Sequence, residues 1–171
     1  MTAFAHLHPD ATLSPTKDEL CAEYSAITER LGSYRAVDPE GEVGIEVIVG
    51  RTFTGELAQL SLTYRAADNA VKKELCRMQH SVLGERSVAF GADDRVARDE
   101  WTRIVVESDT SAEFSTGPQR FRAYGTGGEG QIFIFSTLVE EDPAPGQLRV
   151  IDAETGKDYL AGIVSTRAKR L

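Results

Sequence analysis

The chain has 171 residues, a formal net charge of −8, 27% charged residues and 41% hydrophobic residues. This size and balance predict one globular domain, residues 1–171, with a substantial core. The acidic excess argues against nucleic-acid binding, which needs lysine and arginine to neutralise phosphates. No apolar run approaches the roughly 20 residues that cross a bilayer, and no signal-peptide pattern begins the chain, so we expect a cytoplasmic protein without a membrane partner. Cys21 and Cys76 lack CxxC spacing and are expected to be buried, reduced thiols.

Residues 2–10 are predicted to form an edge strand that places His6 and His8 on one face, with Asp10 nearby. A His-x-His pair can begin a metal site. Because no third or fourth ligand follows at a useful spacing, we expect an exposed strand and no bound metal.

The first helix is predicted to begin at Ser14-Pro15, with serine as the N-cap and proline as the first helical residue. Its buried face is predicted from apolar residues at helical spacing: Leu20, Tyr24, Ile27 and Leu31. Gly32 is expected to end the helix.

Asp38-Pro39-Glu40-Gly41 predicts a type I turn between two strands. A four-residue loop sets Val37 opposite Glu42, Arg35 opposite Gly44 and Tyr34 opposite Ile45. The period of two then predicts one apolar face, made of Tyr34, Ala36, Val43, Ile45, Val47 and Val49.

Thr54-Gly55 predicts a second hairpin turn. That register pairs three apolar residues of each strand: Val49 with Leu60, Val47 with Leu62, and Ile45 with Tyr64. The opposite, polar face is our candidate binding face: Arg35, Glu42, Gly44, Glu46, Thr63 and Arg65. It is open to two interpretations, a surface ion-pair network or a binding patch for a partner or polar small molecule. Glu42 and Glu46 would lie about 13 Å apart, too far for a glycosidase pair, so no catalytic residue is assigned.

Residues 68–74 predict a loop or short helical turn, and residues 75–90 predict two strands with a turn at Gly84-Glu85. His80 alternates with the apolar residues of this segment, which favours a hydrogen-bonded core histidine over a catalytic one. Tyr64 and His80 together mark a candidate pocket between the sheet and the helices.

A second helix is predicted to begin at Asp93-Asp94, with a buried stripe of Ala97, Trp101, Ile104 and Val105. Trp101 is expected to anchor the core. The Ser/Thr-rich residues 108–117 predict a surface loop.

The last third, residues 118–166, is predicted to be β-rich, with a hairpin at Glu154-Thr155-Gly156-Lys157. Residues 132–135 are apolar on both faces, which predicts a central strand covered on both sides. The basic tail, residues 167–171, is interpreted as a solvated end.

Residues 125–130 match G-x-G-x-x-G. The dinucleotide-binding form requires a helix after the glycines, but a β-rich run follows. The kinase form requires further motifs that are absent from the residues that follow. We therefore interpret this segment as a flexible hairpin loop and expect no cofactor.

Four segments in order carry a family resemblance: Thr12-Leu13-Ser14-Pro15-Thr16-Lys17 with Glu19-Leu20, Asp38-Pro39-Glu40-Gly41-Glu42-Val43-Gly44-Ile45-Glu46, Leu62-Thr63-Tyr64-Arg65, and His80-Ser81-Val82-Leu83-Gly84 with Arg86. On these segments, within residues 10–105, the chain resembles the N-terminal cap domain of maltokinases and the stand-alone maltokinase-cap-like proteins. The resemblance implies an α+β fold in which a curved antiparallel β-sheet, a meander, packs against two main helices.

In full-length maltokinases the cap lies over the nucleotide-binding part, and the phosphoryl-transfer residues belong to later lobes whose motifs are absent here. The resemblance therefore implies a cap without the kinase, and no enzymatic activity. It links the chain to maltose, trehalose or α-glucan metabolism only by analogy.

Two hypotheses for function follow. The first is a non-catalytic binding or regulatory module that docks on a kinase or a trehalose/glycogen-pathway enzyme through the candidate binding face. The alternative is a binder of a sugar or sugar phosphate, or an unrecognised enzyme, that uses the pocket near Tyr64 and His80. Either a monomer or a homodimer is compatible with the sequence.

Overall fold

The computed structural model describes residues 3–166; the basic tail discussed above lies outside the described residues. The helical elements are α1 (Lys17–Tyr24), α2 (Arg95–Val106) and the short 3-10 turns η1 (Ala67–Asn69) and η2 (Gly91–Asp93). The strands of the first part are β1 (Phe4–Ala5), β2 (Leu13–Ser14), β3 (Ile27–Val37), β4 (Gly44–Thr52), β5 (Leu57–Ala66), β6 (Cys76–His80) and β7 (Gly84–Phe90). The strands of the last part are β8 (Glu113–Phe114), β9 (Phe121–Gly125), β10 (Gln131–Val139), β11 (Gln147–Asp152) and β12 (Asp158–Ser165).

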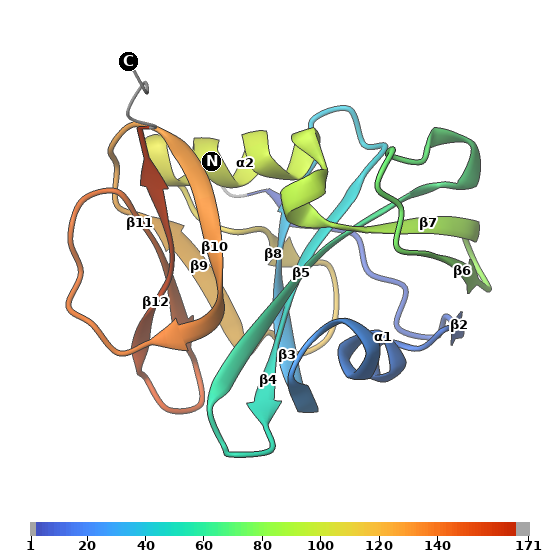
Figure 1. Ribbon diagram of the computed structural model, residues 1–171, viewed down its shortest axis with the longest axis horizontal. Coiled ribbons are helices and arrows are strands. Elements are labelled where there is room, and N and C mark those ends of the chain that lie inside the picture. Colours follow the sequence, from blue (N-terminus) through green and yellow to red (C-terminus); the bar gives the residue numbers. More distant parts are fainter. Residues whose placement is uncertain (1–2, 167–171) are drawn as a thin grey trace.

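The main sheet is antiparallel and forks at β5. Along one edge β5 pairs with β4, which pairs in turn with β3. Along its other edge β5 pairs with β7 over Leu62–Ala66 and with β10 at Ala58. Figure 1 shows the result: β9–β12 lie on one side, β6 and β7 on the other, and β3, β4 and β5 run between them. The predicted α+β class, with a meander and two main helices, is confirmed.

Two hydrophobic cores lie on opposite faces of β4, because its successive side chains point to opposite sides. Val47 belongs to the first core, with Tyr34 of β3, Trp101 of α2 and Phe121 of β9. Ile48 belongs to the second core, which includes α1 and parts of β5, β6 and β7. β4 is therefore covered on both faces.

The first helix is shorter than predicted at both ends. Thr16, not Ser14, is its N-cap, and the Thr16 and Glu19 side chains each bind the other residue's backbone N–H. The sequence itself contains the T-x-x-E spacing that indicates such a capping box. The helix ends at Tyr24 because the Ser25 hydroxyl donates to the Cys21 carbonyl and accepts from the Ile27 N–H. Residues predicted as its last turns, through Gly32, belong to β3.

The first hairpin keeps the predicted turn and faces but not the predicted register. The Gly41 N–H donates to the Asp38 carbonyl at 2.9 Å, which closes the turn. The Asp38 carboxylate also accepts from the backbone N–H groups of Glu40, Glu42 and Val43. These bonds lengthen the loop, so Arg35 lies opposite Glu46 rather than Gly44. A shift of two residues preserves parity, and the predicted apolar face lies wholly in the first core.

The second hairpin is shifted by one residue, and this overturns the predicted face of β5. Backbone bonds join Thr52 to both Gly55 and Glu56, which makes the loop one residue longer than predicted. Tyr64 therefore lies opposite Gly44 instead of Ile45, with Leu62 opposite Glu46. A one-residue shift moves every side chain of the strand to the other face. Leu60, Leu62 and Tyr64 consequently lie in the second core.

The last third is β-rich, and its hairpin between β11 and β12 lies at the predicted residues. β10 lies between β5 and β12, but the prediction that both its faces are covered is wrong: Phe133 is 64% exposed. The glycine loop at 125–130 is not a hairpin either, because β12 and β11 lie between β10 and β9. Instead, Gly125 lets β9 approach α2, since a Cβ there would overlap the Ile104 carbonyl.

Most of the predicted N-terminal strand is irregular. Among its described residues, 3–10, only Phe4 and Ala5 form a strand. This strand pairs in parallel with β8, within the segment predicted as a surface loop. The turn between β6 and β7 precedes Gly84, rather than including it as predicted, since Gly84 pairs with His80. Within the described residues, no helix is long and apolar enough to cross a membrane.

Candidate functional site

The predicted binding face does not exist as one surface, because the register of β5 divides its residues. Arg35, Gly44 and Glu46 lie on the face of the second core. Thr63 and Arg65 point to the opposite face of the sheet. There Arg65 forms two hydrogen bonds of 2.8 Å with the Asp94 carboxylate at the start of α2.

The Asp94 carboxylate holds the Arg65 side chain in place on that side of the sheet. The same carboxylate also accepts from the Val96 N–H and so caps α2. Burial acts to raise the pKa of Asp94, but hydrogen bonds from Arg65 and Thr63 outweigh it and lower the pKa. This pair is therefore a fixed ionic link between β5 and α2, not a free binding group.

Glu46 is fully buried, which the sequence interpretation did not foresee. One carboxylate oxygen accepts from Lys17 at 2.9 Å and from Arg35 at 2.8 Å, and the other accepts from the Tyr64 hydroxyl at 2.7 Å. Burial alone would raise the pKa of Glu46, but the two cations and the hydroxyl reverse this effect and hold the pKa well below its ordinary value. Glu46 is thus an ionised structural centre that ties α1, β3, β4 and β5 together.

Gly44 makes the Tyr64 contact geometrically feasible. The Tyr64 ring packs over Gly44, and a Cβ at this position would lie 3.2 Å from Tyr64 Cδ2. A missing side chain in mid-strand lets another group approach the backbone. In the structure, that group is the cross-strand tyrosine, whose hydroxyl then reaches Glu46.

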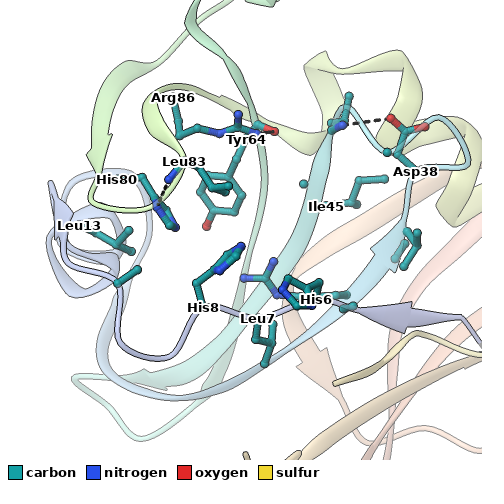
Figure 2. A pocket seen from close by; sticks show the side chains of 18 of the residues that line it. His6, Leu7, His8, Leu13, Asp38, Ile45, Tyr64, His80, Leu83 and Arg86 are labelled. Atoms are coloured by element: carbon teal, nitrogen blue, oxygen red, sulfur yellow. Dashed lines mark hydrogen bonds between the residues drawn. The ribbon is translucent and has the colours of Figure 1, made fainter. Parts of the chain in front are cut away.

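A pocket of about 580 Å³ opens on this face of the sheet, beside α1 and beneath the N-terminal segment. Both predicted pocket residues, Tyr64 and His80, line it. Figure 2 shows Tyr64, His80 and Arg86 on one side of the space, with Leu7 and His8 facing them. Its lining also includes Lys17, Arg30, Arg35, Asp38 and Glu42.

The N-terminal segment that covers the pocket is anchored at both ends. At one end the Leu7 N–H donates to the Ser115 hydroxyl, next to the β1–β8 pair. At the other end Thr12 exchanges hydrogen bonds with Ser81, next to the β2–β6 pair. Residues 7–11, between these anchors, form one wall of the pocket.

The three histidines of the chain meet at this wall. The His8 ring lies 4.9 Å from that of His6 and 5.7 Å from that of His80, between centroids. The Nδ1 atom of His80 accepts from the Val82 and Leu83 N–H groups, which holds the ring in place. Among residues 3–166, no group of His, Cys, Asp and Glu side chains has an arrangement suited to a metal ion.

The carboxylates of the site are not arranged for acid–base chemistry. Glu46 is ionised and its oxygens are occupied by three donors. Asp38 is buried, and its oxygens accept backbone N–H groups of the turn. Glu42 is exposed and forms no ion pair with any described residue. The site is equipped to bind a ligand by charge and hydrogen bonding.

Sequence reasoning missed Lys17, His8 and Arg86 as members of the site. Arg86 stands in one of the segments that carry the family resemblance, so it could have been found there. Its face could not be assigned without the correct register of β5, because β7 pairs with that strand and inherits its orientation.

The fold and the pocket together define an α+β domain whose central strands are covered on both faces and carry a ligand-sized site. Residues 22–94, from within α1 to the N-cap of α2, match the maltokinase N-terminal cap domain family. This match confirms the resemblance seen in the sequence. The match covers somewhat less than half of the chain and is to a cap, not to a kinase domain. We found no match among curated proteins or solved structures.

Proposed function

We propose that the chain acts as a cap-type binding module that holds a small polar ligand in the pocket beneath its N-terminal segment. The pocket itself is the observation that supports this proposal. Its volume of about 580 Å³ falls in the range typical of small-molecule sites. Its lining combines apolar residues such as Met78 and Leu83 with charged groups from several strands.

We propose a binding role without catalysis because the acidic groups of the pocket are committed to structure. A general acid or base needs an accessible proton and a pKa near the working pH. Neighbouring donors occupy the oxygens of Glu46 and Asp38, so neither carboxylate is free to exchange a proton with a ligand. The family supports sugars and sugar phosphates as the first ligands to test, by analogy only.

Docking on a kinase or a trehalose/glycogen-pathway enzyme stays a prediction. The face predicted for it is divided between the two sides of the sheet. Three residues of that face line the pocket: Arg35, Glu42 and Gly44. We therefore favour the small-ligand hypothesis over the docking hypothesis.

Thermal-shift measurement against sugars, sugar phosphates and nucleotides tests the proposal. A ligand that binds only the native state stabilises it by about 2.7 kcal/mol when present at 100 times its Kd. We expect at least one of these compounds to raise the Tm in a saturable manner. If none does at millimolar concentration, the proposed function is wrong.

Two substitutions in the turn between β6 and β7 locate the binding. Leu83 and Val82 are both exposed, at 49% and 57%, but only Leu83 lines the pocket. Leu83→Trp should narrow the pocket and reduce the ligand-induced rise in Tm, whereas Val82→Trp should leave it unchanged. Equal responses in the two variants would place the ligand elsewhere.

A further inference from the structure

Arg86 differs from the other cations that line the pocket. Lys17 and Arg35 are paired with Glu46, and Arg30 is paired with Asp18. Arg86 has no carboxylate partner among residues 3–166. Its terminal nitrogen donates to the Tyr64 carbonyl at 3.3 Å, and its buried Nε–H has no acceptor there. Arg86 is therefore a partly desolvated guanidinium whose charge the described protein leaves uncompensated.

The surroundings of Arg86 are positive. Burial lowers the pKa of His80, and the charges of His8, Arg86 and Lys17 lower it further. Burial likewise lowers the pKa of Arg86 itself. An uncompensated charge in a partly desolvated site is costly, and an anion would relieve that cost.

The acidic side chains of the lining, Asp38 and Glu42, lie in the turn between β3 and β4, and β5 separates β4 from the strand that carries Arg86. Hydrogen bonds to Asp94 are the main cause of the raised pKa of Arg65, and the charges of Asp38 and Glu42 add to it. These two carboxylates therefore act on Arg65, beyond the sheet. Neither contributes to the pKa of His80 or Arg86.

A second guanidinium lies across the pocket from Arg86. Arg35 of β3 and Arg86 of β7 are on the same face of the sheet, with β4 and β5 between them. Three strand spacings across the sheet and four residues along it separate their backbones by about 20 Å. The Nε–H of Arg35 is also buried and has no acceptor among the described residues. Between the two arginines lie Gly44 and Tyr64, where the bulk of a ligand would rest.

From these observations we propose that the pocket binds a phosphorylated small molecule, with Arg86 as the primary receptor of the phosphate. Guanidinium groups match the geometry and charge of phosphate oxygens. Arg35 contributes positive charge at the margin, and the unphosphorylated part of the ligand lies over Gly44 and Tyr64. This inference names the ligand class of the proposed binding function and rests on it.

Calorimetric titration with matched compounds tests the proposal: glucose against glucose 6-phosphate, and adenosine against AMP, with glucuronate as a carboxylate. We expect the phosphate ester of at least one pair to bind about tenfold or more tightly than its neutral partner. Glucuronate, with a single charge, should bind more weakly than glucose 6-phosphate. Tighter binding of glucuronate would overturn the assignment to a phosphate.

Substitutions then assign the phosphate to Arg86. Arg86→Met should weaken the phosphate ester about tenfold or more and leave any neutral compound unchanged. The control Arg95→Met alters an arginine whose side chain is 84% exposed on α2, outside the pocket lining, and should have no effect. Equal loss in both variants, or no loss in either, would overturn the role of Arg86.

If Arg86→Met does not fold, the comparison of neutral compounds with their phosphate esters on the wild-type protein still tests the proposal. Neutral compounds that bind as tightly as their phosphate esters would refute the ligand class while the proposed binding function stands. If no compound binds in the wider thermal-shift panel, the binding function and the ligand class are both wrong.

Discussion

Glu46 connects three segments of the chain at the scale of a single residue. Lys17 comes from α1, Arg35 from β3 and Tyr64 from β5, and each donates to the same carboxylate. The two cations share one anion, so the centre keeps one net positive charge next to the pocket. Glu46 therefore both stabilises the fold and sets the charge of the site.

Replacement of Glu46 by glutamine should destabilise the protein. The change keeps the shape of the side chain but leaves Arg35 without its anion in a buried setting. We expect a loss of about 3 kcal/mol in the free energy of unfolding, at the lower end for broken buried ion pairs because Lys17 can turn toward water. Denaturant titration measures this loss, and the exposed Glu42→Gln should change stability by no more than about 0.5 kcal/mol. Similar values for the two variants would contradict the buried ion-pair centre.

The difference in stability between wild type and Glu46→Gln should depend on pH. The pKa of Glu46 in the folded state lies below its ordinary value of 4.5, so its ionisation stabilises the fold above that pH. As the pH falls below 4.5, the unfolded state takes up the proton first and this stabilisation is lost. The stability difference between wild type and Glu46→Gln should thus shrink between neutral pH and roughly pH 3. A difference that stays constant over this range would refute the depressed pKa.

At the scale of an element, two glycines of β4 allow two different kinds of close contact. A Cβ at Gly50 would overlap the Glu29 carbonyl and the Ile27 side chain, where β3 bulges. A Cβ at Gly44 would meet the ring of Tyr64 at 3.2 Å, and a ring can shift by a few tenths of an ångström.

We therefore expect Gly50→Ala to cost about 1–3 kcal/mol, as overpacking of a rigid site does. The loss of stability in Gly44→Ala should be smaller than that in Gly50→Ala by about 1 kcal/mol or more, because alanine restricts the unfolded chain and the Tyr64 ring can adjust. Denaturant titration of both variants measures the difference. Gly44→Ala as costly as Gly50→Ala would mean that the tyrosine is held as rigidly as the backbone.

Sequence patterns predicted some elements of the fold correctly. Alternation along β3 and β4 predicted the first core face correctly, and the Asp94 N-cap with its apolar stripe predicted α2. The register of β5 was missed because β4 carries buried side chains on both faces. Gln59 and Thr63 of β5 are buried too, beside apolar neighbours. When both faces of a strand are buried, alternation no longer selects between registers that differ by one residue.

The candidate site could be predicted only in part for the same reason. Tyr64 and His80 were named for a pocket, and the structure places both in one. The N-terminal segment that completes the pocket has no regular periodicity, because side-chain contacts with Ser81 and Ser115 hold it. Contacts of this kind join residues far apart in the chain and leave no local pattern.

At the scale of the whole molecule, charge is distributed unevenly. The chain carries a net charge of −8, yet the groups that act on His80 are all positive. The pocket lining carries more basic than acidic side chains. A concave site with an excess of one charge concentrates ligands of the opposite sign, even on a protein whose overall charge repels them. An acidic protein with a basic pocket is thereby suited to selecting small anions.

A pH titration of the histidine ring signals by NMR tests this account most directly, because His6, His8 and His80 all line the pocket. In the free protein, burial and the nearby charges should place the pKa of His80 below its ordinary 6.5. A bound phosphate favours the charged imidazolium, so saturation with the phosphate ester that raises the Tm should raise this pKa. A His80 titration that is identical in the free and saturated protein would contradict an anion in this pocket.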